Sequence, residues 1–324
     1  MKFEEIKAIA VIGAGTMGPG LAQVFAQHHY QVRLCDQSEQ SLEKARSVTR
    51  ANLETMVEHD LLEAPEIETV EGHISFTDSL EDAATRAELV VECIAEERES
   101  KRKLFEQLDE MCPKNTIFAS NTSYLNIFEL LAEARLPVTV IAHWFAPPHI
   151  LPLVEVVRGP ESSDNTVNVV LELLRKVGKT PVVMEKFVPG FAINRILRIL
   201  GREIFFLLDN GYITAEQLDL AVKASIAPRM MLLGLVQRYD FTGLDLSAKN
   251  LQNKAFIEAP LDKEPKSLLR LVEQGDLGVK TGKGFYDYQS KELEEILHER
   301  DSSLLEILKR VEFCLKEPVG KKKS

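Results

Sequence analysis

The sequence has few cysteines, one tryptophan and fewer basic than acidic residues. Among 324 residues, 39 are Lys or Arg and 50 are Asp or Glu, which gives a formal net charge of −11. This balance argues against partners that are nucleic acids or anionic membranes. No apolar run reaches about 18 residues, and the acidic start, Met1–Glu5, lacks the apolar core of a signal peptide. These absences favour a cytoplasmic globular protein whose partners are small molecules.

The cysteines exclude further classes of site. They are Cys35, Cys93, Cys112 and Cys314. Their spacing is not that of a zinc site or a redox pair, so we expect reduced, mostly buried thiols and no metal. The length allows two domains or one large one.

The first motif present is a glycine-rich turn near the N-terminus. An apolar run over residues 8–12 breaks into Gly13, Gly15 and Gly18, and a helical pattern follows at once. These glycines permit a tight strand-to-helix turn, the approach of a pyrophosphate to the backbone, and close packing of helix on strand, respectively. A second apolar run ends in Asp36, which would accept hydrogen bonds from a ribose 2′-hydroxyl and repel a 2′-phosphate. This context predicts a site for NAD rather than NADP, over the alternative of a turn that binds nothing.

The character of the chain changes near residue 187. Residues 1–186 alternate short apolar runs with helical patterns, which is typical of a mostly parallel, doubly wound sheet. From 187 onward the pattern is helical, and an amphipathic segment at 292–315 is expected to pack on the body or on a partner subunit. We therefore predict an α/β domain, residues 1–186, followed by an all-helical domain, residues 187–324.

A histidine and a carboxylate carry the strongest catalytic signal. His143 follows the apolar run 138–142, and open α/β sheets bind ligands at the carboxyl ends of their strands. Glu155 lies inside an apolar run, where a carboxylate is costly unless it has a partner. A bend at Pro147-Pro148 would let the two meet. Glu155 would then orient the ring, so that the free nitrogen takes a proton from a substrate hydroxyl. The alternative is a structural ion pair.

Two further polar residues are candidates for holding a substrate oxygen. Ser123 ends the polar stretch 120–123 that directly follows an apolar run, although this stretch would also serve as a helix N-cap. Asn194 lies five residues past Pro189, where it would face a cleft or lie on a helix surface.

Together these motifs resemble the L-3-hydroxyacyl-CoA dehydrogenase family. In order over residues 8–288 they are Gly13-Ala-Gly-Thr-Met-Gly18, Ser120-Asn-Thr-Ser123, His143-Trp-Phe-Ala-Pro-Pro148, Leu153-Val-Glu-Val-Val157, Pro189-Gly-Phe-Ala-Ile-Asn-Arg195 and Lys280-Thr-Gly-Lys-Gly-Phe-Tyr286. The resemblance implies a Rossmann-type domain and a helical domain that forms a homodimer. It also implies interconversion of a short (3S)-3-hydroxyacyl-CoA and its 3-keto form with NAD.

The resemblance also implies roles for individual residues. His143 matches the general base and Glu155 its orienting carboxylate, while Ser123 and Asn194 match residues that hold the reacting oxygen. The residues that match cofactor contacts are Gly13, Gly15, Thr16, Met17, Gly18, Asp36, Glu96, Lys101 and Lys280.

The chain departs from the usual pattern of the family where the substrate would bind. Ala146 stands where the family usually has Asn. Asn52 and His59 stand where a Ser and a Lys usually contact coenzyme A. Arg46 and Arg50, one helical turn apart, would hold phosphates instead or be solvated charges.

A second departure suggests another class of substrate. Arg229 lies in a stretch, 228–234, that resembles the branch acting on free hydroxy acids, such as gulonate and carnitine dehydrogenases. In a cleft this Arg would pair with a free carboxylate, whereas on the surface it would not. A free 3-hydroxy acid is therefore the alternative substrate. A non-catalytic NAD-binding protein is a third interpretation, because fold alone does not imply catalysis.

Overall fold

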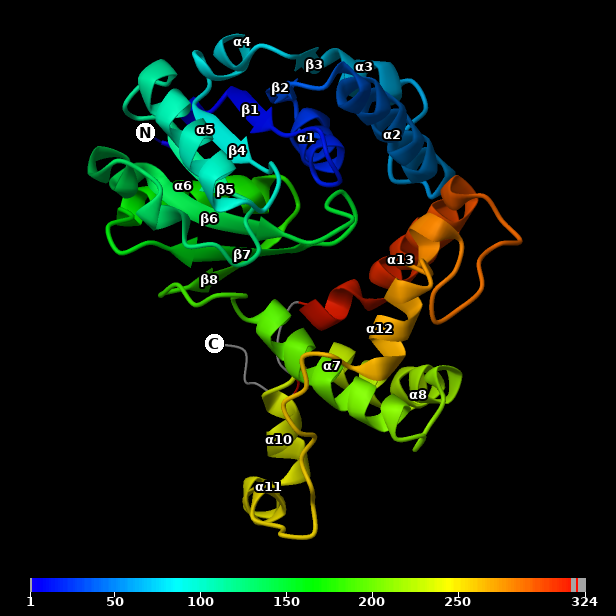
Figure 1. The fold of residues 1–324 in the computed structure, drawn as a ribbon. Coiled ribbons are helices and arrows are strands. Elements are labelled where there is room, and N and C mark those ends of the chain that lie inside the picture. The colour runs from blue at the N-terminus through cyan, green and yellow to red at the C-terminus, as the bar shows by residue number, and fades with distance from the viewer. Residues whose placement is uncertain (1, 316–318, 320–324) are drawn as a thin grey trace. The chain divides into compact units, whose positions relative to one another are not determined.

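The computed structural model describes residues 2–315 and 319, and the chain divides into two units (Figure 1). Unit 1 is Met1–Arg195 and unit 2 is Ile196–Ser324. The boundary falls inside α7 (Ile193–Asp209), so the first residues of this helix belong to the unit that contains the sheet.

Within the described part of unit 1, the strands form one eight-stranded sheet in the order β3-β2-β1-β4-β5-β6-β7-β8. The strands are β1 (Ala8–Ile12), β2 (Gln31–Cys35), β3 (Ile74–Thr77), β4 (Leu89–Glu92), β5 (Ile117–Ser120), β6 (Thr139–Trp144), β7 (Leu153–Arg158) and β8 (Thr180–Met184). Neighbours pair in parallel except β6 and β7, which are antiparallel. The predicted mostly parallel, doubly wound sheet is confirmed.

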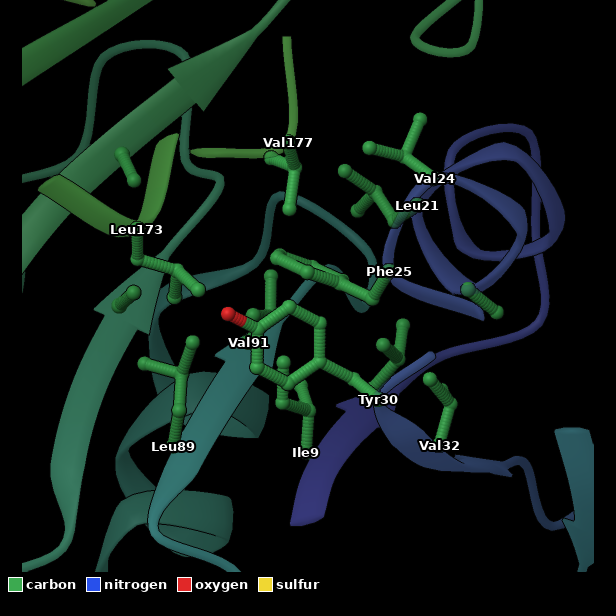
Figure 2. Close-up of a cluster of buried hydrophobic side chains, with 14 of the residues drawn as sticks. Ile9, Leu21, Val24, Phe25, Tyr30, Val32, Leu89, Val91, Leu173 and Val177 are labelled. Atoms are coloured by element: carbon green, nitrogen blue, oxygen red, sulfur yellow. The ribbon is translucent and has the colours of Figure 1, made fainter. Parts of the chain in front are cut away.

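Helices cover both faces of this sheet because its strands are apolar on both sides. They are α1 (Gly18–Gln27), α2 (Glu39–Glu58), α3 (Glu66–Gly72), α4 (Leu80–Ala84), α5 (Arg98–Met111) and α6 (Asp164–Lys176). One buried cluster joins β1, β2 and β4 to α1, α2 and α6. Figure 2 shows the part of it that comes from β1, β2, β4, α1 and α6. A second cluster takes the alternate side chains of the same strands and packs them against α4 and α5. The strand order reverses between β1 and β4, which is where such sheets bind ligands.

Unit 2 is helical, as predicted. Its described residues form the rest of α7 together with α8 (Ala215–Ala221), α9 (Ala227–Leu233), α10 (Gln237–Thr242), α11 (Leu244–Leu251), α12 (Lys266–Glu273) and α13 (Leu293–Val311). Two isolated bridges around Lys283 are the only sheet-like pairing among these residues. The predicted amphipathic segment at 292–315 corresponds to α13 and a short 3₁₀ turn, Glu312–Leu315. Among the described residues, no helix is both long and apolar enough to cross a bilayer.

The close packing of Gly159 on an aromatic ring makes the first prediction. A Cβ at Gly159 would lie 2.4–2.8 Å from three ring carbons of the buried Phe128. We expect Gly159→Ala to lower the stability of unit 1 by about 1–3 kcal/mol, because a rigid ring must move. Thermal unfolding followed by the fluorescence of Trp144, the single tryptophan and a buried one, reports on this unit. Gly72→Ala is the matched control, since its Cβ would meet no atom within 4 Å. Equal midpoints for the two variants would contradict the prediction.

Candidate active site

The glycine turn between β1 and α1 has the shape of a phosphate cradle. Gly13 has φ 111°, and a Cβ there would lie 2.7 Å from the carbonyl oxygen of Cys93. A Cβ at Gly18 would lie 2.0 Å from the carbonyl oxygen of Gly13. A Cβ at Gly15, in contrast, would meet no atom within 4 Å. Gly13 and Gly18 are therefore required by the turn itself, whereas Gly15 leaves open space beside the backbone for a ligand.

The backbone N–H groups at the start of α1 can serve this cradle. Thr16 is exposed and Met17 is half-buried, and the helix begins directly after them at Gly18. The positive end of a helix favours a pyrophosphate, as the predicted NAD site requires.

Asp36 is attached to the same turn. Its Oδ2 accepts a hydrogen bond from the N–H of Ala14 at 2.8 Å, and its Oδ1 accepts one from Ser38 at 2.9 Å. Each carboxylate oxygen keeps a further lone pair for a ribose hydroxyl. The residues of this loop therefore fit a dinucleotide, and Asp36 stabilises the loop itself.

The predicted pairing of His143 and Glu155 is present. The two residues lie directly opposite each other in the antiparallel register of β6 and β7. His143 Nδ1 lies 2.9 Å from Glu155 Oε2, and the residues are only 4% and 2% exposed. A carboxylate on Nδ1 makes this nitrogen the donor and leaves Nε2 as the acceptor. Among the described residues, none forms a hydrogen bond with Nε2.

Glu155 also holds the start of α7. Its Oε1 accepts hydrogen bonds from the N–H groups of Ala192 and Ile193, at 2.9 and 3.1 Å. Burial raises the pKa of Glu155, but the hydrogen bonds from His143 and from these two N–H groups outweigh burial and hold the pKa below its ordinary value. Asn194 follows directly and is half-buried. One carboxylate therefore orients the candidate base and fixes the start of α7, the helix that carries Asn194.

Two aromatic rings that sequence reasoning missed enclose the histidine. The ring of His143 lies 4.6 Å from that of Phe145 and 5.2 Å from that of Phe191, measured between centroids. Phe191 is fully buried and has φ 49°, a left-handed conformation that is costly for an aromatic residue. Packing against His143 and Phe187 compensates for this strain. Only the apolar character of Phe191, two residues before α7 begins, was visible in the sequence.

Ser123 lies on a turn after β5 and does not cap a helix. The N-cap position of the next helical turn, Ile127–Glu129, is occupied by Asn126. The N–H of Ser123 donates to Glu96 Oε1 at 2.9 Å. Within the described part of the chain, the hydroxyl of Ser123 has no hydrogen-bond partner. Both Ser123 and Glu96 are half-buried, so a ligand can reach them.

The candidate substrate residues in and directly after α2 lie on unit 1, and two of them already have side-chain partners there. Arg50 pairs with Glu71 at 3.1 Å. The amide of Asn52 donates to Gln23 at 3.0 Å, and His59 is the C-cap of α2.

The remaining candidates lie in unit 2. Arg229 is exposed on α9 and donates to the carbonyl and hydroxyl oxygens of Ser225 at 3.1 and 2.9 Å. Lys280 is exposed in the 3₁₀ turn Val279–Thr281. Both side chains are therefore available to a ligand.

The geometry of the glycine turn generates the second prediction. Gly15→Ala should fold normally but raise the Kd for NADH roughly tenfold or more, because its methyl group occupies the open cradle. Gly18→Ala should instead disturb folding, since its methyl group would collide with the carbonyl of Gly13. Fluorescence titration with NADH and circular dichroism separate the two effects. An unchanged Kd for folded Gly15→Ala would show that this turn does not hold the pyrophosphate.

Two family models match most of the chain. The 3-hydroxyacyl-CoA dehydrogenase NAD-binding domain matches residues 8–187, and the 3-hydroxyacyl-CoA dehydrogenase C-terminal domain matches residues 190–288. A probable 3-hydroxybutyryl-CoA dehydrogenase of Bacillus subtilis is 37% identical over 291 residues, which cover 89% of this chain and 99% of the relative. A 5-formyl-3-hydroxy-2-methylpyridine 4-carboxylate 5-dehydrogenase of Mesorhizobium japonicum is 33% identical over 311 residues, which cover 95% and 99%.

Solved structures give the same relationship. The crystal structure of a 5-formyl-3-hydroxy-2-methylpyridine 4-carboxylic acid 5-dehydrogenase, described as an NAD+-dependent dismutase, matches with a TM-score of 0.85 at 31% identity and covers 95% of this chain and 99% of its own. The (S)-3-hydroxybutyryl-CoA dehydrogenase of Ralstonia eutropha matches with a TM-score of 0.69 at 28% identity, with coverages of 88% and 99%. The chain thus belongs to the 3-hydroxyacyl-CoA dehydrogenase family and is an NAD-dependent oxidoreductase.

Proposed function

We propose that this chain oxidises a hydroxyl group on carbon 3 of an acyl substrate, with His143 as the general base. The observation that carries the proposal is the buried hydrogen bond between His143 Nδ1 and Glu155, which leaves Nε2 as an acceptor. Nε2 removes the hydroxyl proton, and Glu155 stabilises the imidazolium that results. Ser123 and Asn194 hold the substrate oxygen. Bound NAD supplies the acceptor for the hydride.

The first candidate substrate is a short-chain (3S)-3-hydroxyacyl-CoA, which would yield the 3-ketoacyl-CoA and place the enzyme in fatty acid metabolism. Support comes from both family models and from relatives named 3-hydroxybutyryl-CoA dehydrogenase. The reverse reduction would use the same groups, with the protonated His143 as the acid.

The second candidate is a free hydroxy acid. The match to the Mesorhizobium pyridine-carboxylate dehydrogenase covers 95% of this chain, whereas the C-terminal family model ends at residue 288, before α13. The usual contacts to coenzyme A on α2 are replaced, and Asn52 is already engaged by Gln23. The guanidinium of Arg229 would pair with the free carboxylate.

We also propose a cytoplasmic homodimer that associates through the helical unit. Large apolar side chains of α7, among them Leu197, Ile199 and Leu200, are exposed. Apolar surface of this kind is typical of permanent subunit interfaces. All four cysteines are free thiols, which agrees with a reducing compartment.

The assignment of the base predicts a large loss of turnover. His143→Ala should lower kcat by about 10²–10⁴-fold, because no other group takes the proton, while NADH still binds. His73→Ala is the control. His73 directly precedes β3 and so lies at the amino ends of the parallel strands, whereas ligands bind at their carboxyl ends. Steady-state kinetics and NADH titration measure both effects. Near-normal turnover in His143→Ala would refute the mechanism.

The substrate proposal predicts the outcome of a panel of initial rates. The panel contains 3-hydroxybutyryl-CoA, free 3-hydroxybutyrate, carnitine, gulonate and the pyridine carboxylate named for the Mesorhizobium relative. The highest kcat/KM is expected with 3-hydroxybutyryl-CoA. If only free acids react, the first candidate is wrong and the second takes its place. In that case Arg229→Gln should raise KM for the free acid by roughly tenfold or more, the cost of a lost charge-assisted pair.

A further inference from the structure

A buried charge cluster at the carboxyl ends of β4 and β5 plays no part in the mechanism above. Glu92, the last residue of β4, is 1% exposed, and Lys101 of α5 is 0% exposed. Lys101 Nζ donates to Glu92 Oε1 at 2.5 Å. A buried pair of this kind is costly to form unless its other polar atoms also find partners. The connections of the cluster therefore show what it holds in place.

The charge of Lys101 is satisfied entirely inside the protein. Besides Glu92, its ammonium group lies 3.4 Å from the carbonyl oxygen of Ile94 and 3.4 Å from Glu96 Oε2. Without exposed surface, Lys101 acts on a ligand only through one of these partners. Glu96 is the partner with surface of its own, since 24% of its side chain is exposed.

Glu96 holds the turn that carries Ser123. Its Oε1 accepts hydrogen bonds from the hydroxyl of Thr122 at 2.5 Å and from the N–H groups of Ser123 and Tyr124 at 2.9 and 3.1 Å. Burial raises the pKa of Glu96, but these hydrogen bonds and the Lys101 charge outweigh it and lower the pKa. The ionised carboxylate thus satisfies three donors of one turn and leaves the Ser123 hydroxyl to the substrate.

Glu92 holds the same turn from the other side. Its Oε2 accepts a hydrogen bond from the hydroxyl of Ser120 at 2.5 Å. The hydroxyl oxygen of Ser120 in turn accepts a hydrogen bond from the N–H of Thr122 at 3.2 Å. Asn121 lies between Ser120 and Thr122 in the chain. Its side-chain oxygen accepts a hydrogen bond at 2.8 Å from the N–H of Trp144, the residue after His143 in β6. The cluster therefore ties the Ser123 turn to the strand that carries the base.

We propose that Glu96 is a positioning residue that acts through Ser123, and that Lys101, anchored by Glu92, holds the Glu96 carboxylate in place. Glu96 sets the position of the Ser123 hydroxyl relative to the reacting oxygen. This inference rests on the proposed function of Ser123. It assigns Lys101 a role behind Glu96 rather than a direct contact with the cofactor.

A double-mutant cycle tests the inference. Glu96→Gln and Ser123→Ala should each lower kcat by roughly 10- to 100-fold, because each removes the hold on the reacting oxygen. The double variant should be no worse than Ser123→Ala alone, since one effect acts through the other. Glu99→Gln, the same change at an exposed position of α5, is the matched control and should keep full activity.

Hydrogen exchange of the segment 121–125 provides a second readout that does not depend on catalysis. The amides of this segment should exchange faster in Glu96→Gln than in the wild-type protein. In Glu99→Gln they should exchange at the wild-type rate. The inference would be overturned if the losses of kcat in the two single variants multiplied in the double variant. It would also be overturned if hydrogen exchange were unchanged in Glu96→Gln. Failure of the proposed function appears separately, as normal turnover in His143→Ala. If Glu96→Gln does not fold, Glu96→Asp, which keeps the charge on a shorter side chain, replaces it in the same cycle.

Discussion

The carboxylate of Glu155 is the constraint on which the candidate catalytic geometry depends. An ionised acid that is 2% exposed must satisfy both oxygens inside the protein, because an unpaired buried charge costs several kcal/mol. One oxygen orients His143, and the other binds the two N–H groups at the start of α7. The same requirement thus selects the tautomer of His143, the candidate base, and fixes the turn next to Asn194. Orientation of this histidine follows from the need to solvate a buried charge.

The acids at and after the end of β4 follow the same logic. Glu92 and Glu96 accept hydrogen bonds from side chains and backbone N–H groups after β4 and β5, as Glu155 does from β6 and the start of α7. In each case the hydrogen bonds of the carboxylates hold a residue in place while one of its polar atoms, Ser123 Oγ or His143 Nε2, forms no hydrogen bond with the described residues. Rigid placement of unsatisfied polar atoms prepares a site for a transition state, because no reorganisation is then required during reaction.

Much of this arrangement was predictable from sequence because its causes are local. Apolar runs of strand length and the glycine spacing identify the sheet and the cradle, and the cost of a lone carboxylate in an apolar strand points from Glu155 to His143. The same argument applies to Glu92, at the end of the apolar run 89–92, although its partner Lys101 is set by the docking of α5. The antiparallel register of β6 and β7 and the left-handed Phe191 depend on tertiary packing, which no local pattern encodes.

The candidate catalytic and cofactor residues of this chain lie at different places from the residues that are expected to contact the rest of the substrate. The dyad, the cradle and the charge cluster lie at the strand ends of unit 1, where buried charges and tight backbone contacts allow few replacements. The positions that depart from the usual family pattern are the half-buried Asn52 of α2 and its C-cap His59, the exposed Ala146 in the loop after β6, and the exposed Arg229 of α9. Changes at exposed positions such as Ala146 and Arg229 cost little stability, so a substrate preference can shift while the candidate base and its supports stay in place. Family membership therefore establishes an NAD-dependent oxidoreductase here, whereas we expect the choice between an acyl-CoA and a free carboxylate to depend on these replaceable positions.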